Sequence, residues 1–255
     1  MTTRCPFRDE SVRGSPFSSG SVKSGAGSPI CRVMDNRTVG GSVTALWMQQ
    51  IGLDASAGDL VVSSQERAYA AGLTASRAQQ FLASRGWMRS CLSSQHCVDP
   101  LEVPLTAPPG APPRLPDGWG YVSLSHCADA CLLGWSQQPI GVDLERADRK
   151  IHAAAALVRR FFTEFEQGEL MELEGDQLRQ QVLDRWLLKE AAIKWQQGSL
   201  AQDLGFWEVS SNLRTAVHHG LNLKVAAQLW SQGEWRLGVA VSEKEFLQDC
   251  LLCAA

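Results

Sequence analysis

Two carboxylates alternate with apolar residues in the segment 140–145, whose sequence is I-G-V-D-L-E. On a β-strand, Asp143 and Glu145 point to one face and the apolar side chains to the other. Like charges held side by side repel unless a cation lies between them, and hard oxygen ligands of this kind suit magnesium. An isolated D-x-E also has a simpler explanation, the solvated outer face of a half-buried strand, so a metal site needs support from other residues.

A second carboxylate position lies on a predicted helix over residues 176–197. Glu190 falls inside the apolar sector of this helix, and Lys194 lies one turn further on the same side. A carboxylate on a core-facing stripe is costly unless it is paired or bound to a metal. The alternative is a Glu190–Lys194 helical ion pair, worth only about 0.2–0.5 kcal/mol. The sector that decides between them is defined by Leu178, Val182, Leu183, Trp186, Leu187 and Ile193.

Ser125 and His126 end a predicted strand just before a loop. Adjacent residues on a strand point in opposite directions, so these two are poorly arranged as nucleophile and base, and no G-x-S-x-G elbow surrounds them. They are better suited as donors to an anionic ligand, and a simple strand-end turn explains them equally well.

Three further charged residues have two explanations each. Glu166 fits a T-x-x-E capping box that begins at Thr163, which is a sufficient structural reason for it. Arg85 and Arg89 lie one turn apart on a predicted helix, where they could clamp a phosphate together. A solvated helix face is the default explanation for such a pair.

The elements that must position these residues alternate between short strands and helices, which predicts an α+β fold. Strands are expected at 43–51, 120–125, 131–136, 140–145, 206–210, 221–229 and 235–241. Helices are expected after a capping box at Ser63 and Glu66, and at 74–92, 152–162, 164–173 and 176–197, with Gly198 ending the last. The Pro-rich stretch 104–116 must be a loop. The three-residue gap between 131–136 and 140–145 predicts an antiparallel hairpin.

The bulk composition excludes some partners. The formal net charge of −3 and the pI near 6.0 argue against nucleic acid or an anionic membrane, and no apolar run is long enough to span a bilayer. Without a secretory signal, the eight cysteines, including the C-x-x-C of Cys250 and Cys253, are expected to be reduced in a cytoplasmic protein. Residues 1–40 are poor in large apolar side chains, so we expect a disordered tail or a start at Met34.

Four motifs follow one another along the chain: S-H, G-V-D-L-E, R-F-F-T-x-x-E and W-L-L-K-E-A-A-I-K. Their order and spacing over about residues 43–242 resemble the Sfp-type 4′-phosphopantetheinyl transferases, particularly the cyanobacterial branch. The resemblance implies two similar α+β halves related by a pseudo-twofold axis, 41–138 and 139–245, followed by a tail at 246–255. Coenzyme A would bind in the cleft between the halves.

The resemblance also implies roles for individual residues. The magnesium ligands would be Asp143, Glu145 and Glu190, and Lys194 with Glu190 would flank the diphosphate. Glu166 would be the base or a water-positioning acid. The coenzyme A ligands would include Ser125, His126, Arg85 and, beside it, Arg89. The chain departs from the family's G-K-P or G-R-P at Gly110-Ala111-Pro112, where Arg114 is the candidate replacement for the missing cation, and Cys127 replaces the last serine of S-H-S.

The implied reaction moves the phosphopantetheine arm of coenzyme A onto a serine of an apo-acyl or peptidyl carrier protein, with magnesium, and a single chain would suffice as a monomer. The carrier could belong to fatty-acid, polyketide, peptide or glycolipid synthesis. Two alternatives from other classes are a non-catalytic module that binds coenzyme A or a carrier protein, and a magnesium-dependent phosphohydrolase that uses water.

Overall fold

The computed structural model describes residues 44–50, 60–127, 130–243 and 252–254 of the 255-residue chain. The expected tail 1–40, with Met34, and the thiol pair of Cys250 and Cys253 lie outside the residues whose side chains are described. The first half contains β1 (Thr44–Gln50), α1 (Ser64–Ala71), α2 (Ala75–His96), β2 (Tyr121–Cys127) and β3 (Ala130–Ser136). The second contains β4 (Ile140–Arg146), α3 (Ala154–Phe161), α4 (Glu164–Leu170), α5 (Gly175–Gln196), α6 (Leu200–Asp203), β5 (Trp207–Val209), β6 (Thr215–His218), β7 (Leu223–Gln232) and β8 (Trp235–Ser242). β9 (Leu252–Ala254) follows.

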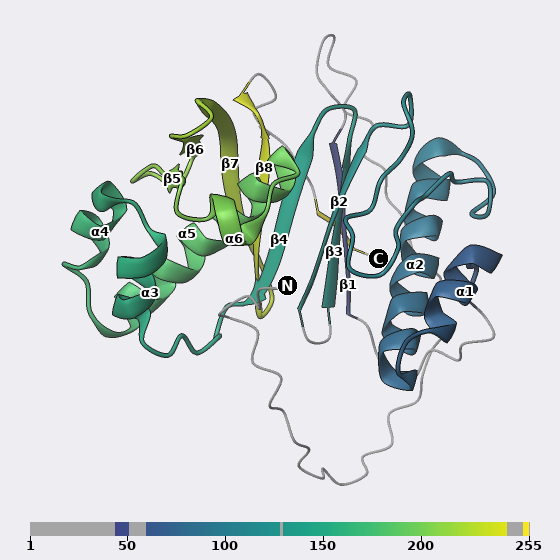
Figure 1. Cartoon of the computed structure of the whole chain (residues 1–255), viewed down its shortest axis with the longest axis horizontal. Helices are drawn as coiled ribbons and strands as arrows, with labels where there is room; N and C mark the ends of the chain where they lie inside the picture. The colour runs from purple at the N-terminus through teal and green to yellow at the C-terminus, as the bar shows by residue number, and fades with distance from the viewer. Residues whose placement is uncertain (1–43, 51–59, 128–129, 244–251, 255) are drawn as a thin grey trace, which may run out of the picture.

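Two sheets lie back to back with helices outside them (Figure 1). The first sheet has the order β2-β3-β1-β9 and the second β4-β8-β7-β6-β5. All neighbours are antiparallel except β1 and β9. An apolar core fills the space between the sheets, and a further core lies under the helices of each half. Each half also has one helix of 22 residues, α2 or α5. The predicted α+β class is confirmed.

The predicted hairpin between β3 and β4 is wrong. β3 is buried along its whole length and pairs with β1 on one edge and β2 on the other, so neither edge is left for β4. β4 instead pairs with β8 in the other sheet. The short segment 137–139 is therefore a crossing between sheets, at the place where the sequence puts the boundary between halves.

Most other elements agree with the sequence pattern. Both capping boxes are present, at Ser63 and Thr163, and the loop 104–116 has no helix or strand beyond a single bridge to Arg114. α2 extends to His96, four residues past the prediction. The turn that ends α5 puts Gln197, with φ 58°, in the left-handed conformation, and Gly198 only donates its N–H back to the helix. The sequence did not predict α6, β6 or β9.

The helix α5 is buried on all sides from Val182 to Ile193, where the sequence predicts a single apolar sector. One side lies against β4 and β8, and the others against α3, α4, α6 and β5. Two glycines allow this close approach: a Cβ at Gly141 would overlap the carbonyl oxygen of Ala191, and one at Gly238 would lie 2.9 Å from the carbonyl oxygen of Leu187. The backbones of β4 and β8 therefore pack directly against the backbone of α5, the helix that carries Glu190.

Among the described residues, no helix is both long and apolar enough to cross a membrane. The cysteines described with their side chains, Cys91, Cys97, Cys127 and Cys131, are free thiols, as expected.

Candidate active site

Asp143 lies where the edge strands β2 and β4 meet beside α5, and the residue as a whole is only 3% exposed. Its Oδ1 accepts hydrogen bonds from Ser125 Oγ and from Lys194 Nζ, both at 2.6 Å. Lys194 Nζ also donates to the carbonyl oxygen of Val142 at 3.0 Å. The second oxygen, Oδ2, is buried and has no hydrogen-bond partner among the described residues. A buried acceptor of this kind is costly unless a ligand satisfies it.

Glu190 faces Asp143 from α5 and is also buried. Its Oε1 accepts a hydrogen bond from Trp186 Nε1 at 2.6 Å, one turn earlier on the helix. Burial and the charges of Asp143 and Glu145 together raise the pKa of Glu190 to about 7, against the opposing effects of Lys194 and of the hydrogen bond from Trp186. The carboxylate thus binds a proton far more readily than an exposed one, because the cost of burial outweighs the favourable charge of Lys194.

Glu145 is the third carboxylate of the group. Arg149 donates to its Oε1, and the thiol of Cys127 lies 3.3 Å from its Oε2. Burial raises the pKa of Glu145, and the charge of Asp143 raises it further, while Arg149 opposes both. Burial and the carboxylate of Glu145 raise the pKa of Cys127 to about 12, so the thiol is protonated and acts as a donor.

The side chains of Asp143, Glu145 and Glu190 are chemically suited to a divalent cation, although they are not arranged around a common point as ligands of a bound ion would be. In the described part of the chain, no group of three or more His, Cys, Asp or Glu side chains is arranged as a metal centre. Lys194 and Arg149 lie against two of the carboxylates in its place. The unpartnered Oδ2 of Asp143 and the raised pKa of Glu190 both indicate that more positive charge would stabilise the cluster.

One sequence-based alternative for this group, the solvated outer face of the strand, is wrong. Asp143 and Glu145 face α5 and not solvent, while Ile140, Val142 and Leu144 point into the core between the sheets. The strand alternation is therefore confirmed, and the solvated face is not. Lys194 reaches across to β4 and contacts Asp143, and its charge also lowers the pKa of Glu190, so it interacts with both carboxylates.

Glu166 belongs to a separate cluster on the other side of α5. Its carboxylate is fully buried, closes the capping box with Thr163, and accepts a hydrogen bond from Val209 N at 3.1 Å. Its Oε2 also lies 2.6 Å from Lys189 Nζ. Both oxygens are occupied by protein donors, which supports the structural explanation and leaves no oxygen for a base. The sequence analysis did not identify Lys189 as a buried residue. Its position between Trp186 and Glu190, in the most apolar part of the helix, was the feature that could have indicated its burial.

Arg85 and Arg89 are buried, so neither the phosphate clamp nor the solvated face describes them. Arg89 pairs with Glu66 at 2.8 Å and donates to carbonyl oxygens of the loop after α2. Arg85 donates to the carbonyl oxygen of Ala107 at 2.8 Å and stacks over Phe81. Burial lowers the pKa of Arg85 to about 10. Both arginines connect α2 to neighbouring segments through hydrogen bonds, and both are too buried in this structure to contact coenzyme A.

His126 is exposed while Ser125 is buried, which confirms that the two side chains point in opposite directions. They therefore do not form one site. Arg114 and Ala111 are both exposed on the loop before β2. Arg114 pairs with Thr106 through its backbone alone.

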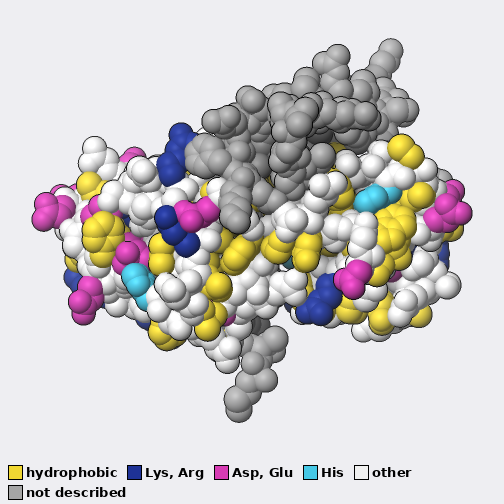
Figure 2. Space-filling view, turned by 90° about the horizontal axis from the view of Figure 1, so that it is seen from above, with side chains coloured by type: hydrophobic (Ala, Val, Ile, Leu, Met, Phe, Trp, Pro, Cys, Tyr) yellow, Lys and Arg dark blue, Asp and Glu magenta, His cyan; other side chains and the backbone are white. Residues whose placement is uncertain are grey.

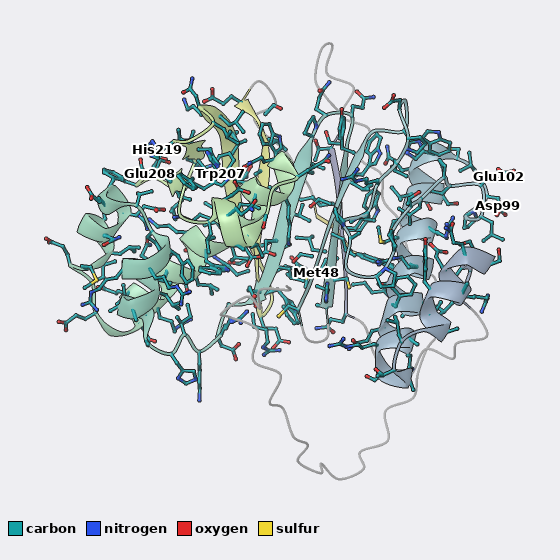
Figure 3. All side chains as sticks on the ribbon, in the orientation of Figure 1. Met48, Asp99, Glu102, Trp207, Glu208 and His219 are labelled. Atoms are coloured by element: carbon teal, nitrogen blue, oxygen red, sulfur yellow. The ribbon has the colours of Figure 1, made fainter. Side chains whose placement is uncertain are left out.

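Other charged side chains lie at the end of β4, where Arg146 pairs with Asp148 and Glu234, and on the two flanks of the molecule. Figure 3 places Trp207, Glu208 and His219 at the outer flank of the second sheet, and Asp99 and Glu102 beyond α2 on the opposite flank. Figure 2 shows acidic, basic and apolar side chains interspersed on one face of the molecule, with no field of a single charge sign among the described residues.

Comparison with known proteins agrees with this placement of the carboxylates. Residues 139–241, which contain Asp143, Glu145, Glu190 and Lys194, match the family model of the 4′-phosphopantetheinyl transferase superfamily. The chain is also similar to the 4′-phosphopantetheinyl transferase Sfp of Bacillus subtilis (strain 168), with 27% identity over 125 residues. That match covers 48% of the chain and 54% of the relative, so the chain spans about half the length of the curated relative it matches. Residues 139–241 are therefore similar to the 4′-phosphopantetheinyl transferase superfamily.

Proposed function

We propose that this protein transfers the 4′-phosphopantetheine arm of coenzyme A to a serine of an apo-carrier protein. The observation that carries the proposal is the group of two buried carboxylates, Asp143 and Glu190, and the half-buried Glu145, with Lys194 beside them, inside the segment that matches the transferase superfamily. A protein that only bound coenzyme A would have no need to hold three mutually repelling carboxylates in one buried place.

The proposed reaction is a substitution at phosphorus. The serine oxygen of the carrier forms a bond to the β-phosphorus of coenzyme A, and the bond from that phosphorus to the bridging oxygen breaks. The electron pair leaves with adenosine 3′,5′-bisphosphate, and the serine loses its proton. Such reactions depend mainly on positioning and on neutralisation of charge, which fits a site that has carboxylates and a lysine but no activated nucleophile.

Asp143, Glu145 and Glu190 would hold a magnesium ion, whose chemistry is to neutralise charge on the diphosphate oxygens. Lys194 would give up part of its contact with Asp143 and meet the diphosphate. Its side chain is 25% exposed, whereas that of Asp143 is 5% exposed, so the ammonium group lies on the open side of the cluster. Glu166 keeps a structural role in this proposal.

The exposed groups on the first half are the candidates for the rest of coenzyme A. His126 and Arg114 are both exposed, and we assign them to the 3′-phosphate region. We place the protein in the cyanobacterial branch of the Sfp type, acting as a monomer in the cytoplasm. The carrier protein would be acidic and would dock beside the site through mixed polar and apolar contacts, since the face in Figure 2 has no broad basic field.

The test incubates the full chain with a panel of apo-acyl and apo-peptidyl carrier proteins, coenzyme A and magnesium, followed by mass spectrometry of each carrier. We expect a mass gain of one phosphopantetheine group, lost when the acceptor serine is replaced by alanine and when magnesium is chelated. Release of adenosine 3′,5′-bisphosphate without modified carrier would favour the phosphohydrolase. Binding of coenzyme A with neither product would favour the non-catalytic module.

A further inference from the structure

Three side chains of β2 contact β4, although the two strands belong to different sheets. At alternate positions, Ser123 Oγ accepts the N–H of Val142 at 3.0 Å, and Ser125 Oγ donates to Asp143 Oδ1 at 2.6 Å. Cys127, the third of these side chains, lies 3.3 Å from Glu145. Side chains of the first half thus support both carboxylates of the D-x-E pair.

The two carboxylate oxygens of Asp143 differ in their hydrogen bonding. Oδ1 has two donors, Ser125 and Lys194, whereas Oδ2 is buried and has no partner among the described residues. Of the two donors, lysine has a long flexible side chain that can follow an incoming anion, while serine has a single side-chain rotation and is here 4% exposed. Ser125 is therefore the fixed support of the carboxylate.

We infer that Ser125 is a positioning residue, whose hydroxyl holds Asp143 by Oδ1 so that Oδ2 is presented to a divalent cation. The inference rests on the proposed function, because it needs the cation to bind at Asp143. It gives Ser125 a different task from a contact with the 3′-phosphate, since its hydroxyl already donates to Asp143. It also means that the cation site is completed by a residue outside the matched segment 139–241.

The test measures cation binding directly. Manganese, an oxygen-preferring substitute for magnesium, is titrated into the full chain with coenzyme A present, and free manganese is followed by electron paramagnetic resonance. We expect Ser125→Ala to weaken binding by about 10-fold to 100-fold, the usual effect of losing a group that orients a metal ligand. Ser123→Ala is the matched control, because it removes a buried hydroxyl between the same strands without touching a carboxylate. It should lower the melting temperature and leave the affinity unchanged.

Equal affinity in Ser125→Ala and the wild type would overturn the inference and leave the proposed function intact. Equally weakened manganese binding in Ser123→Ala and Ser125→Ala would also overturn it, because a general loss of packing between β2 and β4 would then explain both. Ser125→Cys keeps nearly the same volume with a weaker donor and should also weaken binding, which keeps the test decisive if the alanine variant does not fold. If the wild type binds no manganese with coenzyme A, the metal of the proposed function fails together with the inference.

Discussion

Replacement of Glu190 by glutamine should stabilise the metal-free protein at high pH. Burial and the charges of Asp143 and Glu145 raise the pKa of Glu190 from 4.5 to about 7. That difference corresponds to roughly 3 kcal/mol of unfavourable free energy when the folded protein carries the ionised carboxylate. Glutamine removes the charge, and its amide oxygen can still accept the hydrogen bond from Trp186.

The effect has a definite pH dependence. Because the pKa is higher in the folded than in the unfolded chain, the folded state binds more protons between pH 4.5 and about 7. The free energy of unfolding of the wild type therefore loses this contribution as the pH rises through that window. Below it, wild type and Glu190→Gln should have equal stability; above it, the variant should be more stable by up to roughly 3 kcal/mol.

Urea unfolding with a chelator present, from about pH 4.5 to about pH 8, measures this difference. Glu66→Gln is the matched control with the opposite sign. Burial raises the pKa of Glu66, but hydrogen bonds from Arg89 and Ser63 outweigh it and hold the pKa below 4.5. That variant should be less stable than the wild type above pH 4.5, with the difference shrinking at lower pH. A Glu190→Gln variant that is equally or less stable at about pH 8, with no dependence on pH, would refute the reasoning.

Three further outcomes follow from the packing. Gly141→Ala should cost more than about 3 kcal/mol, because its Cβ would overlap the α5 backbone, whereas Gly168→Ala, with open space around it in a helix, should stabilise by about 0.5–1 kcal/mol; urea unfolding compares the two. Arg89→Met should cost about 3–5 kcal/mol in the same assay because it leaves a buried carboxylate unpaired, while exposed Arg77→Met should be nearly neutral, and equal losses would contradict this. Asp143→Ala should lower single-turnover transfer about 100-fold or more in a protein that still folds, and normal turnover would remove it from the site.

Local sequence patterns predicted the parts of the site that depend on one element at a time. The alternation in 140–145 fixed which face of β4 carries Asp143 and Glu145, because side chains on a strand alternate strictly. The helical period placed Glu190 on a buried face of α5. Both capping boxes were visible for the same reason, since each involves residues only three apart.

Contacts between distant segments were the part that the sequence could not supply. The hairpin expected for β3 and β4 depended on the length of the gap. Strand pairing also depends on which edges are already taken, and the residues of β1 pair with residues of β3 that lie 80 or more positions later, from Gln50 with Ala130 to Thr44 with Ser136. The burial of Arg85 and Arg89 has the same origin. Their partners are on the loop after α2 and on α1, so a helix pattern alone made them appear to be surface residues.

The helix pattern W-L-L-K-E-A-A-I-K shows why a motif does not by itself say which residues do chemistry. Lys189 and Glu190 are neighbours in sequence, but about 100° separates them around α5. Lys189 is fully buried with Glu166, while Glu190 and Lys194 face β4. Because α5 is buried all round, an ion pair on its far side limits rotation of the helix about its axis. Neighbouring residues of one motif thus divide between a buried structural pair and the carboxylate group beside β4.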